Sequence, residues 1–195
     1  MCLERSMSVD KIVAMAIAGG ARIIQYRNKQ SPLAVRLYEA DILSKLCKKL
    51  GAMLLINDDV DIAIEVGADG VHLGQDDMHI REARLRLGGD KIIGVTCHND
   101  LQLAQQAEQA GADYVAFGRF FTSSSKPSAS PASMDTLQQA AKQLSIPVCA
   151  IGGITVDNAP ALIKNGAQML AVINGVFGAW KIAQAAKNYA KLFPA

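Results

Sequence analysis

The sequence predicts an α/β fold, a parallel (β/α)8 barrel whose first strand is missing or short. Two observations lead to this prediction: a repeated helix–glycine–strand unit, and strands that are almost continuously apolar. Glycine just past a helix supplies the left-handed residue that ends it, and apolar strands are expected where both faces of a sheet are covered. Five copies of the unit are Ala18–Lys29, Leu50–Asp59, Val66–Asp77, Ala110–Arg119 and Asn165–Gly175.

Two further apolar runs, Lys91–His98 and Ile146–Gly153, bring the predicted strands to seven. Strands that alternate with helices require right-handed crossovers and a parallel sheet. A closed barrel needs an eighth strand ahead of the helix predicted at Val9–Ala18, and the opening residues provide a poor one. We therefore expect the first strand to be lacking or shortened. An open doubly wound sheet is the competing fold.

The segments between the strands have helical periodicity. Ser31-Pro32 is expected to begin a helix with a serine cap and a proline in the first helical position, and Asp100 is expected to cap another. The predicted helices are Val9–Ala18, Ser31–Leu50, Asp100–Gln109, Ser133–Leu144, Val156–Lys164 and Ala179–Leu192.

Length and composition predict one domain over residues 1–195, half of it apolar. A net charge of +2 gives no strong field for nucleic acid or an anionic membrane, and no apolar run approaches the ~20 residues that span a bilayer. The four cysteines are scattered at positions 2, 47, 97 and 149, which predicts buried, reduced thiols and a cytoplasmic protein. Oligomeric state is left open, a homo-oligomer included.

In a barrel of this kind the chemistry lies in the loops that follow the strands. Gln25, Arg27 and Lys29 alternate along the first visible strand, so they are expected on one side of it. A glutamine and two cations together suit a polyanion such as a diphosphate. The alternative is a strand end whose charges are simply solvated.

Carboxylates follow the next two strands, as Asp58-Asp59 and as Asp76-Asp77. Adjacent loops bring such groups together, and carboxylates that face one point need a cation between them. Mg²⁺ binds through one or two carboxylates with water and substrate phosphate. Helix capping is the alternative role, and both roles can hold if one member of each pair caps.

Three other features follow strands. Gly152-Gly153 and Asn174-Gly175 end the last two strands, where such barrels often bind phosphate through backbone N–H groups. The serine-rich stretch 123–133 is expected to be a mobile active-site loop. His72, His79 and His98 show no ligand spacing and are expected to be packed or solvated.

Taken in order, these motifs resemble the thiamine-phosphate synthase family, from about Val9 to Phe177. They are Q-x-R-x-K at 25–29, I-N-D at 56–58, G-V-H-L-G-Q-x-D at 70–77, G-V-T at 94–96, S-x-S-K at 123–126 and A-I-G-G-I at 150–154. The resemblance implies a TIM barrel that joins hydroxymethylpyrimidine diphosphate to a thiazole phosphate and releases pyrophosphate.

The resemblance also implies roles for individual residues. Mg²⁺ would be bound by Asp58 and Asp77. Contacts to the pyrimidine diphosphate would come from Gln25, Arg27, Lys29, Asn57, Thr96 and Lys126, and contacts to the thiazole phosphate from Gly153, Ile173 and Asn174. The hydroxyls of Ser123 and Ser125 would bind the thiazole phosphate or cover the site. Arg27, Lys29 and Lys126 would neutralise the leaving group. Serines at 123 and 125 replace the usual threonines, and Thr96 and Asn174 replace usual serines.

Two alternatives to this function remain. A thiazole tautomerase is a related barrel that would lack the Q-x-R-x-K and paired-aspartate groups, both of which are present here. A non-catalytic ligand-binding barrel is favoured if the first strand is truly absent. Mg²⁺-dependent release of pyrophosphate would separate these alternatives from the synthase.

Overall fold

The computed structural model describes residues 7–122 and 131–193, and in these residues seven strands form a single parallel sheet. Each strand pairs with the next one along the chain, in the order β1-β2-β3-β4-β5-β6-β7. The strands are β1 (Ile23–Tyr26), β2 (Met53–Asn57), β3 (Gly70–Leu73), β4 (Ile92–His98), β5 (Tyr114–Phe117), β6 (Val148–Ile151) and β7 (Met169–Ala171). Doubly wound sheets reverse their strand order at a switch point, so the sequential order excludes that alternative.

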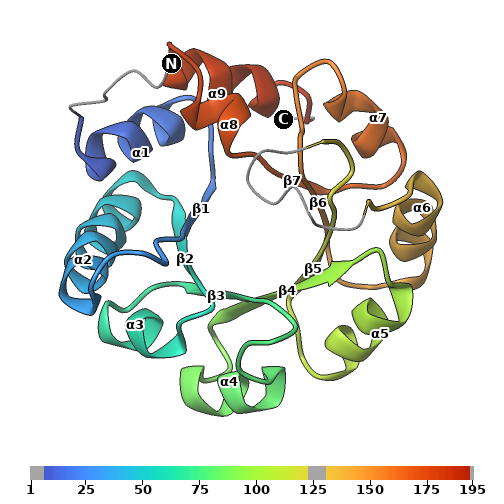
Figure 1. Ribbon diagram of the computed structural model, residues 1–195, viewed down its shortest axis with the longest axis horizontal. Helices are drawn as coiled ribbons and strands as arrows, with labels where there is room; N and C mark the ends of the chain where they lie inside the picture. The colour runs from blue at the N-terminus through green and yellow to red at the C-terminus, as the bar shows by residue number, and fades with distance from the viewer. Residues whose placement is uncertain (1–6, 123–130, 194–195) are drawn as a thin grey trace.

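Helices surround the sheet, which curves into a barrel (Figure 1). They are α1 (Val9–Ala18), α2 (Leu33–Leu50), α3 (Val60–Glu65), α4 (Ile80–Leu87), α5 (Leu101–Gln109), α6 (Met134–Gln143), α7 (Ala159–Lys164), α8 (Asn174–Phe177) and α9 (Ile182–Ala190). Among the described helices, none is both long and apolar enough to cross a lipid bilayer.

Several predicted features of the helices are confirmed. The first helix has the predicted bounds, Gly51 ends α2 in the left-handed conformation at φ 68°, and the Asp100 side chain caps α5. The predicted serine cap of α2 is wrong. That helix begins one residue later than expected, at Leu33, with Pro32 in the cap position. The Ser31 hydroxyl instead accepts a hydrogen bond from Asn28 at 3.0 Å.

The sheet separates two apolar regions. The larger lies between the strands and the helices, and alternate strand residues such as Leu54, Val71 and Ile93 point into it. The smaller fills the inside of the barrel and consists of Leu55, Tyr114, Ala116 and Cys149. A strand residue on the same face of the sheet as these four residues therefore faces the interior of the barrel.

The open side of the barrel lies between β1 and β7, which are the edges of the described sheet (Figure 1). Helix α1 packs against both α2 and α9 there, so helices rather than strand hydrogen bonds connect the two sides. The approach is close at Gly19, where a methyl group would overlap Ala183 and Ala186 of α9. No described residue forms a strand ahead of β1.

Candidate active site

The first group of candidate residues follows β1, and the predicted alternation is confirmed. Gln25, Arg27 and Lys29 are exposed, whereas Ile24 and Tyr26, on either side of Gln25, are buried and Asn28 is partly buried. Gln25 pairs in register with Leu55 of the inner cluster, so it lies on the barrel side of β1. Gln25 therefore faces the interior of the barrel, and Lys29, beyond the end of β1, lines the pocket described below.

The second group follows β2 and joins the first through an ion pair. The Lys29 ammonium lies 2.6 Å from the Asp58 carboxylate. Asp58 adopts a left-handed backbone at φ 65°, and its N–H donates to the His72 carbonyl at 2.8 Å. Asn57 is the last residue of β2. This geometry turns the Asp58 side chain away from the strand and toward the neighbouring loops.

Asp77 completes a pair of carboxylates with Asp58. The Asp77 carboxylate accepts a hydrogen bond from the Gly74 N–H at 2.7 Å, and it lines the same pocket as Asp58. Burial and the Asp58 carboxylate raise the pKa of Asp77. Burial acts to raise the pKa of Asp58 as well, but the Lys29 ammonium beside it helps to outweigh burial, and the pKa of Asp58 is lowered. Asp58 is therefore the more acidic of the two carboxylates.

A divalent cation suits this pair because it would relieve the repulsion between two ionised carboxylates that line one pocket. In the described residues no cluster of three or more acidic, histidine or cysteine side chains forms a metal site. Two carboxylates nevertheless match the Mg²⁺ sites of enzymes that bind phosphorylated substrates, where water and phosphate supply the other ligands. Asp58 and Asp77 are thus the residues that would hold the metal.

The capping alternative holds for one aspartate pair and is wrong for the other. Asp59 caps α3 by accepting from the Ile62 N–H at 3.0 Å, which leaves Asp58 for the pocket. Helix α4 starts only at Ile80, so its cap position falls on His79 rather than on Asp76 or Asp77.

A pocket of about 510 Å³ gathers these groups at the mouth of the barrel. Its lining residues are Asn28, Lys29, Arg36, Asn57, Asp58, Asp59, Asp77 and Met78. Four of them were predicted as site residues. Asn28 and Arg36 were not predicted; Arg36 donates to Asp59 at 3.0 Å, and its buried Nε has no hydrogen-bond partner in the described structure.

The inside of the barrel holds a hydrogen-bonded chain that ends at another candidate, Thr96. The His72 ring lies 2.8 Å from the Thr96 hydroxyl through Nε2 and 2.7 Å from the Tyr114 hydroxyl through Nδ1. His72 is buried, as expected of a packed histidine. Strand alternation could have placed it beside Thr96, because His72 pairs in register with Gly94 two residues earlier on β4.

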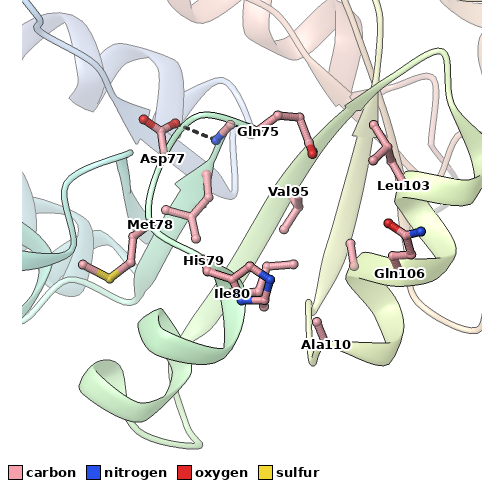
Figure 2. Close-up of a pocket in the computed structure, with 12 residues that line it drawn as sticks. Gln75, Asp77, Met78, His79, Ile80, Val95, Leu103, Gln106 and Ala110 are labelled. Carbon is pink, nitrogen blue, oxygen red and sulfur yellow. Dashed lines mark hydrogen bonds between the residues drawn. The ribbon is translucent and has the colours of Figure 1, made fainter.

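A second cavity, of about 160 Å³, lies behind the loop that carries Asp77 (Figure 2). Figure 2 shows Leu103 and Gln106 of α5, with Ala110 just after this helix, on one side of it and His79 and Ile80 on the other. Asp77 and Met78 line both this cavity and the larger pocket. The loop between β3 and α4 therefore separates the 160 Å³ cavity from the 510 Å³ pocket.

The remaining candidates follow the last two strands. Gly153 has φ 63° and fits against Phe121 and Thr122, where a side chain would overlap the backbone. Ile173 is half exposed and precedes α8, whose first residue is Asn174. Tyr189 of α9 links these exits: it donates to the Ile154 carbonyl at 3.1 Å and lies against Gly175.

Three candidates, Ser123, Ser125 and Lys126, lie outside the described residues. Phe121 and Thr122, the last described residues before these candidates, lie against Gly153. The chain therefore enters segment 123–130 beside the exit of β6.

Comparison with known proteins identifies the family. Residues 3–176 match the family model described as thiamine monophosphate synthase. A thiamine-phosphate synthase from Nitrosococcus oceani is 51% identical over 182 residues, covering 93% of this chain and 84% of that protein. The corresponding protein from Marinobacter nauticus is 54% identical over 166 residues, covering 85% and 74%.

The fold agrees with a solved structure of the same kind. Thiamine phosphate pyrophosphorylase from Pyrococcus furiosus superposes with a TM-score of 0.88 at 34% identity, covering 97% of this chain and 91% of that one. The family match, the relatives and the superposition each cover most of the chain. The chain is therefore an enzyme of the thiamine monophosphate synthase family.

Proposed function

We propose that this enzyme transfers the pyrimidinylmethyl group of hydroxymethylpyrimidine diphosphate to the nitrogen of a thiazole phosphate, giving thiamine phosphate and pyrophosphate. The observation that carries the proposal is that Lys29, Asn57, Asp58 and Asp77 line one and the same pocket. A cation, an amide and a carboxylate pair together suit a magnesium diphosphate. The names of the relatives support the same reaction.

The proposed chemistry is a dissociative substitution. The bond between the pyrimidine methylene carbon and the diphosphate oxygen breaks first, and its electron pair leaves with pyrophosphate. The thiazole nitrogen then donates its lone pair to the methylene carbon. Neither step removes a proton, so the reaction needs no general base and no covalent nucleophile.

The protein groups in this scheme stabilise charge and fix positions. Arg27, Lys29 and Lys126 neutralise the departing diphosphate, and Thr96 lies near it. Gln25 and Asn57 contact the pyrimidine. Asp58 and Asp77 would hold a Mg²⁺ ion, which would supply positive charge to stabilise the departing diphosphate. Ser123, Ser125, Gly153, Ile173 and Asn174 anchor the thiazole phosphate, which aligns its nitrogen with the reacting carbon.

The test supplies both substrates and measures pyrophosphate and thiamine phosphate with and without Mg²⁺. We expect equal amounts of the two products, and none when either substrate or the metal is withheld. Conversion of a thiazole substrate without its pyrimidine partner would instead indicate a tautomerase. Binding of both substrates without pyrophosphate release would indicate a non-catalytic barrel.

A further inference from the structure

The segment that carries Arg27 and Lys29 begins at an edge of the sheet. Strand β1 pairs with β2 on one side, and in the described residues no strand pairs with its other side. An edge strand lacks half of the backbone hydrogen bonds that hold a central strand. Site geometry nevertheless has to be held to about half an ångström, so another part of the fold must fix this segment.

We propose that Glu39 of α2 is a positioning residue that holds Arg27 and Lys29 at the mouth of the barrel through hydrogen bonds to Tyr26 and Asn28. This inference rests on the proposed function, because it takes Arg27 and Lys29 as the groups that bind the diphosphate. Glu39 does not line the pocket, so its effect would pass through the residues it holds.

One carboxylate oxygen of Glu39 makes both contacts. The Tyr26 hydroxyl donates to Oε2 at 2.6 Å, and the Asn28 amide donates to the same oxygen at 3.0 Å. Tyr26 and Asn28 alternate with Arg27 and Lys29 along the chain. Because Tyr26 and Asn28 are held against α2, the side chains of Arg27 and Lys29, which alternate with them, are directed away from α2.

Asn28 extends this hold into the loop. Its Oδ1 accepts from the N–H groups of Gln30 at 3.3 Å and Ser31 at 3.2 Å, and its amide also donates to the Ser31 hydroxyl at 3.0 Å. Lys29 lies inside this turn, and its ammonium reaches Asp58. The path therefore runs from Glu39 through Asn28 to the ion pair at the proposed metal site.

Tyr26 is suited to be a permanent donor to Glu39. Its side chain is buried, and burial followed by the nearby Glu39 carboxylate raises the pKa of the phenol. The hydroxyl therefore keeps its proton, and can donate to Glu39, at neutral pH. A buried, fixed ring at the end of β1 gives the loop a rigid starting point.

The experiment compares Glu39→Ala, Glu39→Gln and the control Asp41→Ala in the full chain. Asp41 is another carboxylate of α2, but its partner is the exposed Lys45 at 2.7 Å. The measurements are KM for each substrate, kcat, the Kd for magnesium pyrophosphate by calorimetry, and the melting temperature. Glutamine keeps a carbonyl acceptor where Oε2 lies, so it separates hydrogen bonding from loss of the side chain.

We expect Glu39→Ala to raise the KM for the pyrimidine diphosphate and the Kd for magnesium pyrophosphate by about 10- to 100-fold, as for other residues that orient site groups. KM for the thiazole phosphate should stay unchanged, and Glu39→Gln should recover most of the loss. Asp41→Ala should match the wild type. If Glu39→Ala does not fold, Tyr26→Phe, which removes one donor alone, carries the same expectation at smaller size.

Unchanged pyrophosphate affinity in a folded Glu39→Ala would overturn the role of Glu39, as would equal changes in both KM values. A Glu39→Gln variant as impaired as Glu39→Ala would also overturn it, because hydrogen-bond acceptance would not be the cause. These results differ from failure of the proposed function, in which the wild type itself releases no pyrophosphate from the two substrates.

Discussion

The carboxylates of Asp58 and Asp77 meet in one pocket although they follow different strands, β2 and β3. Lys29 contacts only Asp58 of the two within ion-pair distance, at 2.6 Å. The pair therefore has one carboxylate that a protein cation stabilises and one that is left for another positive charge. That asymmetry defines the first prediction.

Asp58→Asn and Asp77→Asn should each lower the Mg²⁺-dependent release of pyrophosphate by about 100-fold or more, the scale on which loss of one electrostatic group affects an active site. The melting temperature should change little, since each variant removes a charge from a repulsive pair. Asp76→Asn is the matched control, because Asp76 is an exposed carboxylate in the same loop. Full activity of either variant at saturating substrate would remove that aspartate from the metal site.

Lys126→Ala should lower kcat strongly, because its ammonium is proposed to neutralise the departing diphosphate. The reason comes from the S-x-S-K motif at 123–126, which lies outside the described residues. Lys142→Ala, an exposed lysine of α6, serves as the control. Single-turnover kinetics would measure the chemical step directly, and an unaltered single-turnover rate would contradict the proposed role.

Gly94→Ala should lower the free energy of unfolding by about 1–3 kcal/mol through overpacking. Gly94 faces the inside of the barrel, and a methyl group there would overlap the ring of Tyr114. Displacing that ring would also break its hydrogen bond to His72. Urea denaturation measures the change, with Gly89→Ala as control because its added methyl meets no atom within 4 Å. Equal stability of the two variants would contradict the packing argument.

The three described cysteines should not react with thiol reagents in the folded enzyme. Burial raises the pKa of Cys47 to about 11 and the pKa values of Cys97 and Cys149 to about 12. Because the thiolate is the reactive form, almost none is present at neutral pH. A Cys2→Ser variant treated with Ellman's reagent should show three thiols only after denaturation. Rapid labelling of the native variant would show that a cysteine is accessible.

The strand-borne part of the site was predictable because topology alone brings it together. All strands of a parallel barrel end at the same rim, so residues directly after β2 and β3 had to approach each other, and Asp58 and Asp77 do. The alternation of Gln25, Arg27 and Lys29 followed from strand geometry in the same way. Such arguments need the order of the elements and no detail of side-chain packing.

The helix-borne part could not be predicted from local patterns. Whether Arg36 or Glu39 reaches a loop depends on how α2 is rotated about its axis against β1, and tertiary packing fixes that rotation. Ser31 shows the same limitation at smaller scale. A Ser-Pro pair favours a cap, but the hydroxyl is bound by Asn28, which Glu39 also holds.

The contact between α1 and α9 has a consequence for synthesis of the chain. Val13 and Ile17 of α1 are buried in the finished molecule, and α9 supplies part of their cover. A ribosome makes α1 long before α9, so the apolar face of α1 stays partly uncovered until almost the whole chain has emerged. Nascent chains should therefore be prone to aggregation and dependent on chaperones until the last helix docks, and a stop codon ahead of α9 should give an insoluble product.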